Sequence, residues 1–226
     1  MAVESEVIPP EILSDIVLFE EHAAKFQSGE IDAAAFRKFR LRQGIYGQRQ
    51  SDVQMIRVKI PGGRLSAAQL SRLGDVAATT LRGVGHITTR QNIQYHFVPL
   101  KDVGGMLRRL GGAGLFTREA CGNTVRNVVA CPMAGSSASE PFDITPYTDA
   151  ICAAFLRNPI CQDMPRKFKI TLEGCADDHA QTWINDVGLT ARIRKIDGRE
   201  ERGFHVAVGG GLGNSRSEER RVGKEC

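Results

Sequence analysis

Hydrophobic positions along the first half of the chain switch between helical and extended spacing. Apolar residues three and four apart over 10–26 predict an amphipathic helix. The alternating segment 53–60, VQMIRVKI, ends at a Pro-Gly-Gly turn and predicts a strand. Ser66 followed by Gln69 is a capping-box pattern in front of an apolar stripe, which predicts a helix over 66–81. The other elements expected in this half are a helix at 32–39, strands at 85–88 and 93–99, and a helix around 103–110.

Residues 53–116 therefore follow the order β-α-β-β-α, which makes up most of a ferredoxin-like unit. A second region begins near Cys121, where strands and helices again alternate. Its expected elements are strands at 123–130, 167–173, 189–196 and 203–208, a helix at 145–157 with Thr145 as N-cap, and a short helix at 179–187. We expect the first sheet to continue into this region. The predicted fold class is α+β, with a ferredoxin-like half-domain followed by part of an α/β domain.

Composition narrows the class of protein. With 226 residues, of which 42% are hydrophobic and 25% charged, the chain can bury at least one sizeable core. Its formal net charge of +4 is too small to imply a polyanionic partner such as nucleic acid. No run of about eighteen apolar residues occurs, and the N-terminus lacks the basic and apolar stretches of a signal peptide. We therefore expect no membrane contact and a cytoplasmic location.

Cysteine spacing offers no recognisable motif. The cysteines of the sequence are Cys121, Cys131, Cys152, Cys161, Cys175 and Cys226. Because none of them forms a C-x-x-C pair, the spacing predicts neither a structural zinc site nor a thioredoxin-type site. In a reducing compartment the expectation for each is a free, buried thiol.

The last stretch, 216–226, departs from the pattern of the rest of the chain. It reads RSEERRVGKEC, has no apolar periodicity, and resembles the translation of a common sequencing adapter codon by codon. We interpret it as an artefactual tail. The expectation is that the natural protein continues beyond Ser215 in another sequence.

Basic residues at four places suggest contacts to anions. The segments 57–59 (RVK) and 167–169 (KFK) each carry two cations spaced by one residue on a predicted strand, so each pair projects from one face. Arg90 stands at a turn between two strands, and Arg126 stands inside an otherwise apolar strand, where an unpaired charge is costly. The plain alternative is that each of these cations faces solvent or pairs with a nearby acid.

Five segments resemble, in the same order, motifs of the siroheme-dependent sulfite and nitrite reductases. They are MIRVKIPGG at 55–63, GHITTRQNIQYHF at 85–97, NTVRNVVACP at 123–132, MPRKFKI at 164–170 and VGGGLG at 208–213. The resemblance covers the chain from about Val53 to Ser215. It implies a helical leader at 1–50, a ferredoxin-like half-domain at 51–117, an incomplete siroheme and [4Fe–4S] domain at 118–215, and the artefactual tail at 216–226.

The resemblance also implies roles for single residues. Those expected to surround the sulfite or nitrite anion on the open face of the siroheme iron are Arg57, Arg126, Lys167 and Lys169. Those expected to hold the macrocycle and its carboxylates are Thr88, Arg90 and Gln94, because a polycarboxylate needs guanidinium and amide donors. Backbone close to the ring is expected at Gly209, Gly210 and Gly211. The implied electron donor is a ferredoxin or a flavoprotein, and these motifs do not distinguish sulfite from nitrite as substrate.

One part of that family's machinery does not occur in the sequence. The family holds its [4Fe–4S] cluster with four cysteines in C-x5-C and C-x3-C pairs, and neither pair is present. We therefore expect the chain to be an N-terminal fragment of a reductase that is inactive on its own. The reaction implied is the multi-electron reduction of sulfite to sulfide or of nitrite to ammonia.

Two other classes of protein stay open at this point. A ferredoxin-like unit with Tyr95 and Phe97 on a strand beside Arg90 could be an RNA-recognition module, but 91–98 does not supply the K/R-G-F/Y-G/A-F-V-x-F/Y pattern which that module needs. A non-catalytic structural protein derived from the reductase fold is the third reading. Siroheme absorption bands in the full-length protein would separate the reductase from both.

Overall fold

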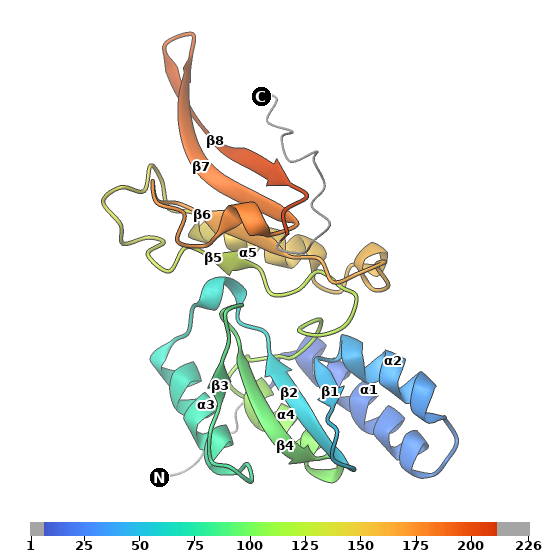
Figure 1. Ribbon diagram of the computed structural model, residues 1–226. Helices are drawn as coiled ribbons and strands as arrows, with labels where there is room; N and C mark the ends of the chain where they lie inside the picture. Colours follow the sequence, from blue (N-terminus) through green and yellow to red (C-terminus); the bar gives the residue numbers. More distant parts are fainter. Residues whose placement is uncertain (1–6, 212–226) are drawn as a thin grey trace.

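The computed structural model describes residues 7–211, which form two stacked units, each built on a four-stranded sheet (Figure 1). The first unit (7–116) contains α1 (Pro10–Gln27), α2 (Ala33–Arg42), β1 (Ile45–Gly47), β2 (Val53–Val58), η1 (Pro61–Gly63), α3 (Ala67–Ala78), β3 (His86–Ile87), β4 (Ile93–Pro99) and α4 (Leu100–Gly111). The second unit (117–211) contains β5 (Val129–Ala130), α5 (Thr145–Phe155), η2 (Pro159–Cys161), β6 (Ile170–Glu173), η3 (Thr182–Ile184), β7 (Val187–Ile196) and β8 (Arg199–Val208). The segment 216–226, interpreted as an artefactual tail, lies outside the described residues.

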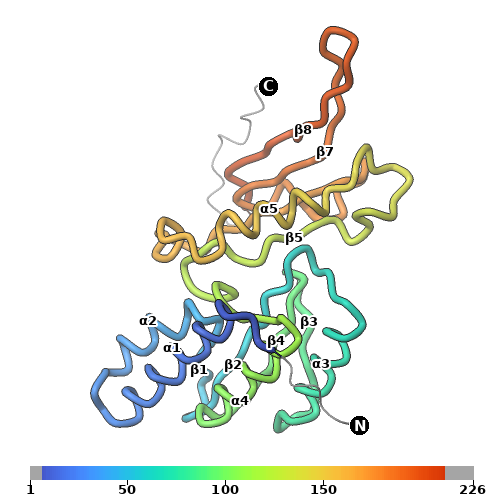
Figure 2. The backbone as a smooth tube through the Cα atoms, turned by 180° about the vertical axis from the view of Figure 1, so that it is seen from behind, coloured from blue at the N-terminus to red at the C-terminus, as the bar shows by residue number. Residues whose placement is uncertain are grey.

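Helices cover one face of the first sheet. Its strands are antiparallel in the order β1-β2-β4-β3, and α1, α3 and α4 lie on the side seen in Figure 2. Ile56, Val58 and Tyr95 point into the core beneath these helices. Phe19 of α1 packs against Phe36 of α2 in the same core, so the segment expected as a leader is part of the first unit. The opposite face of the sheet carries Arg57 together with Tyr46 and Met55.

Helix α3 begins as its sequence pattern predicts. The Ser66 hydroxyl accepts from the Gln69 backbone N–H at 3.1 Å, and the Gln69 side chain accepts from the Ser66 N–H at 3.0 Å. The capping box is therefore confirmed. The two bonds satisfy backbone donors that have no partner inside the helix.

Replacing Ser66 by alanine is expected to cost about 1 kcal/mol of unfolding free energy, because one of these N–H groups loses its acceptor. Urea unfolding followed by circular dichroism measures the change. Ser71→Ala, an exposed position inside the same helix, is the matched control and should leave stability nearly unchanged. Equal effects from both substitutions would contradict the capping role.

The first sheet does not continue into the second unit, so that expectation is wrong. The second sheet has its own order, β5-β6-β7-β8, with β5, β6 and β7 parallel and β7 and β8 forming a long antiparallel hairpin. The backbones of the two units meet at isolated hydrogen bonds, such as those from Gly62 N–H to Val128 C=O at 2.9 Å and from Glu119 N–H to Arg42 C=O at 2.7 Å. The turn η1 follows β2, so this strand ends before it could pair with a strand of the second sheet.

Three elements of the second unit are shorter than expected. The strand expected at 123–130 is β5 alone, because Val128 C=O bonds the first unit. The strand expected at 167–173 starts at Ile170, since the Lys169 N–H donates to the Asp186 carboxylate at 2.8 Å. The helix expected at 179–187 is only the turn η3, because Gln181 adopts a left-handed φ of 54° that interrupts a helix.

Helix α5 occupies most of the expected range but has a different cap. Its N-cap is Ile144 rather than Thr145, and the Thr145 N–H is satisfied by the Asp143 carboxylate at 2.8 Å. Pro146 stands in the first turn, where a missing N–H costs nothing. Within residues 7–211, none of the helices has the length and apolar character needed to cross a bilayer.

Candidate functional site

Arg57 lies on β2, on the sheet face away from the helices. Its register partner across β2 and β4 is Gln94. With the Gln94 amide turned so that both its ends are satisfied, the amide oxygen accepts from Arg57 Nε at 3.0 Å and from Nη2, while the amide nitrogen faces His96 Nε2 at 3.1 Å. Gln94 therefore holds the Arg57 guanidinium in place without neutralising its charge.

Arg126 comes from the loop that leads to β5. Its Nε donates to Ala120 C=O at 3.0 Å and its Nη1 to Gly122 C=O at 3.4 Å. Both partners are neutral carbonyls, so the guanidinium is oriented but keeps its charge. Burial, and then the neighbouring Arg57, hold the pKa of Arg126 below its ordinary value.

Lys167 and Lys169 lie on the segment in front of β6, on either side of Phe168. Phe168 forms a parallel bridge with Val125 and packs against the core of the second unit. The pKa of Lys167 is lowered first by the charge of Lys169, then by burial and by the nearby arginines. The lysines are thus close enough to repel each other.

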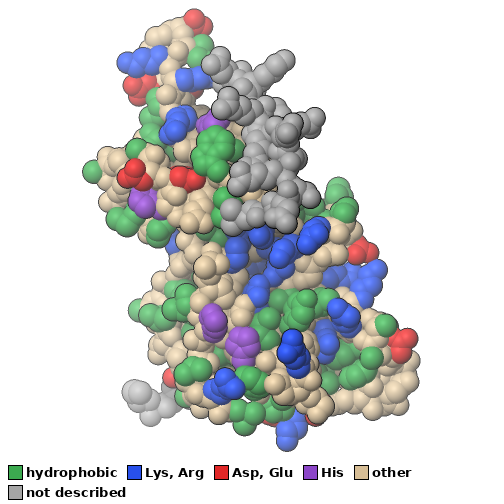
Figure 3. Space-filling model, viewed as in Figure 1, with side chains coloured by type: hydrophobic (Ala, Val, Ile, Leu, Met, Phe, Trp, Pro, Cys, Tyr) green, Lys and Arg blue, Asp and Glu red, His purple; other side chains and the backbone are tan. Residues whose placement is uncertain are grey.

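These four side chains, Arg57, Arg126, Lys167 and Lys169, are called the cation cluster below. They surround a cavity of about 190 Å³ that is also lined by Thr89, Arg90 and Asn92, and none of the described residues adds a carboxylate to this lining. Arg57, Arg126 and Lys167 also line an adjoining, wider cavity of about 640 Å³, where Asp163, the one acid that residues 7–211 contribute, is paired with Lys38 at 3.0 Å. Figure 3 shows lysine and arginine side chains gathered where the two units meet.

The cation cluster is electrostatically unfavourable as it stands. Like charges a few ångströms apart repel one another, and folding gains nothing from bringing them together. A bound anion removes this repulsion and gains charge-assisted hydrogen bonds. The charge of the cavity is therefore suited to a small anion or to the acidic groups of a larger ligand.

Arg90, expected to hold cofactor carboxylates, reaches from the first unit into the second. Its Nη2 donates to Asn127 C=O at 2.6 Å, and its Nη1 donates to the Asn185 side chain at 2.8 Å. Burial lowers its pKa to about 10. Its buried Nε has no hydrogen-bond partner among residues 7–211. Much of this guanidinium serves to join the units.

Of the other expected cofactor residues, Thr88 shapes the turn that carries Arg90. Its hydroxyl donates to the Asn92 side chain at 2.7 Å and accepts from the Arg90 N–H at 3.1 Å. The glycine run follows β8, where Gly209 has a left-handed φ of 76°. A Cβ on Gly210 would overlap the backbone of Asn185, so close packing against η3 already requires glycine there. Gly211 ends the described part of the chain.

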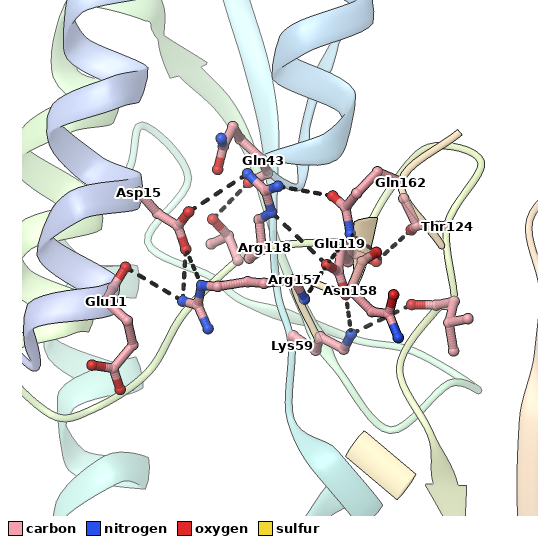
Figure 4. Close-up of polar contacts among 12 residues, drawn as sticks. Glu11, Asp15, Gln43, Lys59, Arg118, Glu119, Thr124, Arg157, Asn158 and Gln162 are labelled. Carbon is pink, nitrogen blue, oxygen red and sulfur yellow. Dashed lines mark hydrogen bonds and ion pairs between the residues drawn. The ribbon is translucent and has the colours of Figure 1, made fainter. Parts of the chain in front are cut away.

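Lys59 does not share the role of Arg57, although sequence spacing suggested that both contact an anion. It is buried and pairs with Glu119 at 3.3 Å, while Glu119 also accepts from the Arg157 N–H and from the Gln162 amide, each at 2.7 Å (Figure 4). Asp15 of α1 joins the same network through Arg157 at 2.7 Å. Lys59 is thus neutralised beneath the junction, and only Arg57 of the pair faces the cavity.

Sequence reasoning missed the residues that join the units. The Asn127 amide donates to Ile60 C=O at 2.7 Å and to Arg90 C=O at 2.9 Å, and the Gln91 side chain bonds both the N–H and the C=O of Ala130. We call Arg90, Gln91 and Asn127 the joint. Neither Gln91 nor Asn127 has a periodicity signal, although both lie inside segments that resemble reductase motifs.

Comparisons with known proteins bear on both units. Residues 121–225 match the family described as nitrite and sulphite reductase 4Fe-4S domain, and residues 46–113 match the nitrite/sulfite reductase ferredoxin-like half domain. An assimilatory ferredoxin-dependent nitrite reductase of Haloferax mediterranei is 35% identical over 183 residues, which cover 76% of this chain and 31% of that protein. A sulfite reductase [ferredoxin] of Mycobacterium tuberculosis is 37% identical over 169 residues, with coverages of 75% and 30%.

Solved structures agree with these matches. The NirA protein of Mycobacterium tuberculosis superposes with a TM-score of 0.77 at 30% identity, covering 94% of this chain and 42% of that chain. A dissimilatory sulfite reductase I shares the fold, with a TM-score of 0.57 at 14% identity. The chain spans about a third of the length of the curated relatives it matches.

Proposed function

Because the chain belongs to the nitrite and sulfite reductase family, we propose that it forms the anion-facing part of a reductase that converts nitrite to ammonia or sulfite to sulfide. The observation that carries the proposal is the cation cluster, whose charges converge on a cavity to which the described part of the chain contributes no carboxylate. Within residues 7–211 no carboxylate forms an ion pair with these four cations, so pairing with a nearby acid does not account for them.

The donor set suits siroheme, a macrocycle with many carboxylates. Guanidinium, ammonium and amide groups line the cavity, and the buried Arg90 Nε has no partner within the described residues. We assign Arg90 and the cation cluster to the acidic groups of the cofactor and to the substrate. When bound, siroheme supplies the electron transfer to the nitrogen or sulfur of the substrate.

The [4Fe–4S] cluster named by the family does not fit the thiols of this part of the chain. Five free cysteines are buried between residues 7 and 211. Within these residues no four cysteines lie close enough together to hold one cluster. A cluster of this type needs four thiolates. No step of the proposed reaction is assigned to these cysteines.

The residues of the chain itself would act on the oxygen atoms of the substrate. Preorganised guanidinium groups of Arg57 and Arg126 stabilise negative charge on those oxygens without reorganising during the reaction. Lys167 can in addition donate a proton as oxygen leaves as water, since the charge of Lys169 and burial lower its pKa. Lys169 adds a further positive charge beside those oxygens. Ferredoxin is the proposed electron donor, because the relatives carry it in their names.

A spectrum tests the proposal. The full-length natural protein that contains this chain is expected to show the ultraviolet–visible bands of siroheme and to reduce nitrite or sulfite with reduced ferredoxin. A colourless protein with no such activity after reconstitution would contradict the proposal and favour a non-catalytic role.

Anion binding to the full-length protein is expected to depend on pH. The pKa of Lys167 lies below its ordinary value, so this lysine loses its proton at a lower pH than a lysine in water does. Affinity for nitrite or sulfite should be constant at low pH and fall before the ordinary lysine value of 10.5 is reached. Calorimetric titration measures this, with Lys195→Met on exposed β7 as control. A Lys167→Met variant with the same pH profile as wild type would contradict the assignment.

A further inference from the structure

The second unit gathers metal-binding side chains at the carboxyl edge of its parallel strands. Ala130 of β5 lies opposite Leu172 of β6 in parallel register. Cys131 follows Ala130 and Glu173 follows Leu172, so these two residues lie at the same edge of the sheet. The loop after β6 then turns back over this edge and adds Cys175 and His179.

The four potential ligand atoms lie at distances suited to one metal ion. Cys131 Sγ lies 3.5 Å from Cys175 Sγ and 3.7 Å from His179 Nδ1, and His179 Nδ1 lies 3.9 Å from a Glu173 oxygen. All four ligand atoms lie within 4.8 Å of one another. Around a tetrahedral zinc ion, zinc–ligand bonds of about 2.0–2.3 Å place neighbouring ligands about 3.3–3.8 Å apart. The side chains thus already have nearly tetrahedral spacing.

The Glu173 carboxylate is held in place by backbone donors. One oxygen accepts from the Cys175 N–H and the other from the Ala180 N–H, each at 2.8 Å. Each carboxylate oxygen has two lone pairs, so these bonds leave one free on each for a metal. Outer hydrogen bonds of this kind orient metal ligands. Glu173 is fully buried, and within residues 7–211 no lysine or arginine lies within ion-pair distance of it.

A bound cation accounts for this combination. Two thiols and a carboxylate in one buried site repel when ionised, and an isolated buried carboxylate is costly. The half-exposed imidazole of His179 leaves a route for a metal to enter. Two sulfurs, one nitrogen and one oxygen form a donor set typical of zinc, whereas a [4Fe–4S] cluster would need four thiolates.

We propose that Cys131, Glu173, Cys175 and His179 bind one zinc ion. On binding, both thiols lose their protons to solvent, and no oxidant or reductant is needed. The ion ties β5, β6 and the 174–181 loop together. The site is separate from the cation cluster, because β6 runs between Lys169 and Glu173, a distance of about 13 Å along an extended chain. It does not depend on the proposed reductase activity.

Metal analysis of the purified protein tests the proposal. The full chain carrying Cys226→Ser, so that the sixth cysteine cannot contribute, is expressed with added zinc, purified under reducing conditions without chelator, and analysed by plasma mass spectrometry. We expect one zinc per chain. Cobalt(II) in place of zinc should give the visible bands of a tetrahedral thiolate site.

Variants distinguish a metal site from a buried thiol pair. His179→Ala removes a half-exposed ligand, so the core should stay folded while zinc affinity falls at least about tenfold. Cys175→Ser should abolish the cobalt bands. Cys161→Ser, a buried cysteine of the same core outside the ligand group, is the matched control and should retain zinc.

Other outcomes would overturn the proposal. They include no zinc in a folded, reduced protein, unchanged affinity in His179→Ala, or iron in place of zinc. Loss of two titratable thiols in the denatured, unreduced protein, with no metal bound, would identify a Cys131–Cys175 disulfide instead.

Discussion

Turnover of the full-length enzyme is expected to fall roughly 10²–10³-fold when Lys169 is replaced by methionine, the magnitude typical of losing one preorganised charge donor. Methionine keeps most of the volume of the lysine stem but removes the ammonium from the cation cluster. In the proposed reaction, the charge that this substitution removes acts on the substrate oxygens. Siroheme content, read from the absorption spectrum, should therefore change much less than the turnover number.

Lys195→Met provides the matched control for that experiment. Lys195 is 75% exposed on β7 and does not line the cavity, so the variant should keep full turnover. If Lys169→Met lost siroheme and turnover in equal proportion, Lys169 would be a cofactor-binding residue instead. Unchanged turnover would remove it from the site altogether.

Replacing Glu119 by alanine is expected to lower the unfolding free energy by about 3–5 kcal/mol, as for other buried ion pairs from which one partner is removed. The variant leaves Lys59 charged, buried and unpaired, and its pKa is already lowered by burial. It also removes the acceptor of the Arg157 N–H and of the Gln162 amide. Urea unfolding of the chain followed by fluorescence of Trp183 measures the loss.

A double variant tests the cause of this loss. Lys59→Met combined with Glu119→Leu removes both charges and keeps similar volumes, so it should regain much of the stability lost in Glu119→Ala. The Arg157 N–H and the Gln162 amide lose their acceptor in both variants. The unfolding free energy that the double variant does not regain therefore measures the cost of leaving these two donors unpaired. A double variant as unstable as Glu119→Ala would mean that the charge of Lys59 is not the main cost.

Local patterns predicted local structure well in this chain. Ser66 and Gln69 are three residues apart, and their reciprocal bonds depend on nothing else in the fold. The helix over 10–26 and the strand over 93–99 likewise follow from periodicity within a few residues. Such signals need no knowledge of which segments meet in space.

Predictions failed where a distant segment supplies the partner. Arg57 and Lys59 look equivalent in the alternation of their strand, yet Glu119, which has a left-handed φ of 60° in a loop, neutralises only Lys59. Cys131 and Cys175 are separated by 43 residues that carry no spacing motif, and the parallel register of β5 and β6 brings them into contact. Contacts between distant segments depend on the topology of the fold, which the periodicity of the sequence does not reveal.

The joint between the units has a consequence for anion selectivity. Arg57 belongs to one unit and the two lysines to the other, so their separation is set by the docking angle that Arg90, Gln91 and Asn127 maintain. A rotation of a few degrees there would widen or narrow the charged opening while every cation kept its own hydrogen bonds. In the proposed reductase, substitutions at Gln91 and Asn127, which do not line the cavity, would then shift the preference between a planar and a pyramidal oxyanion.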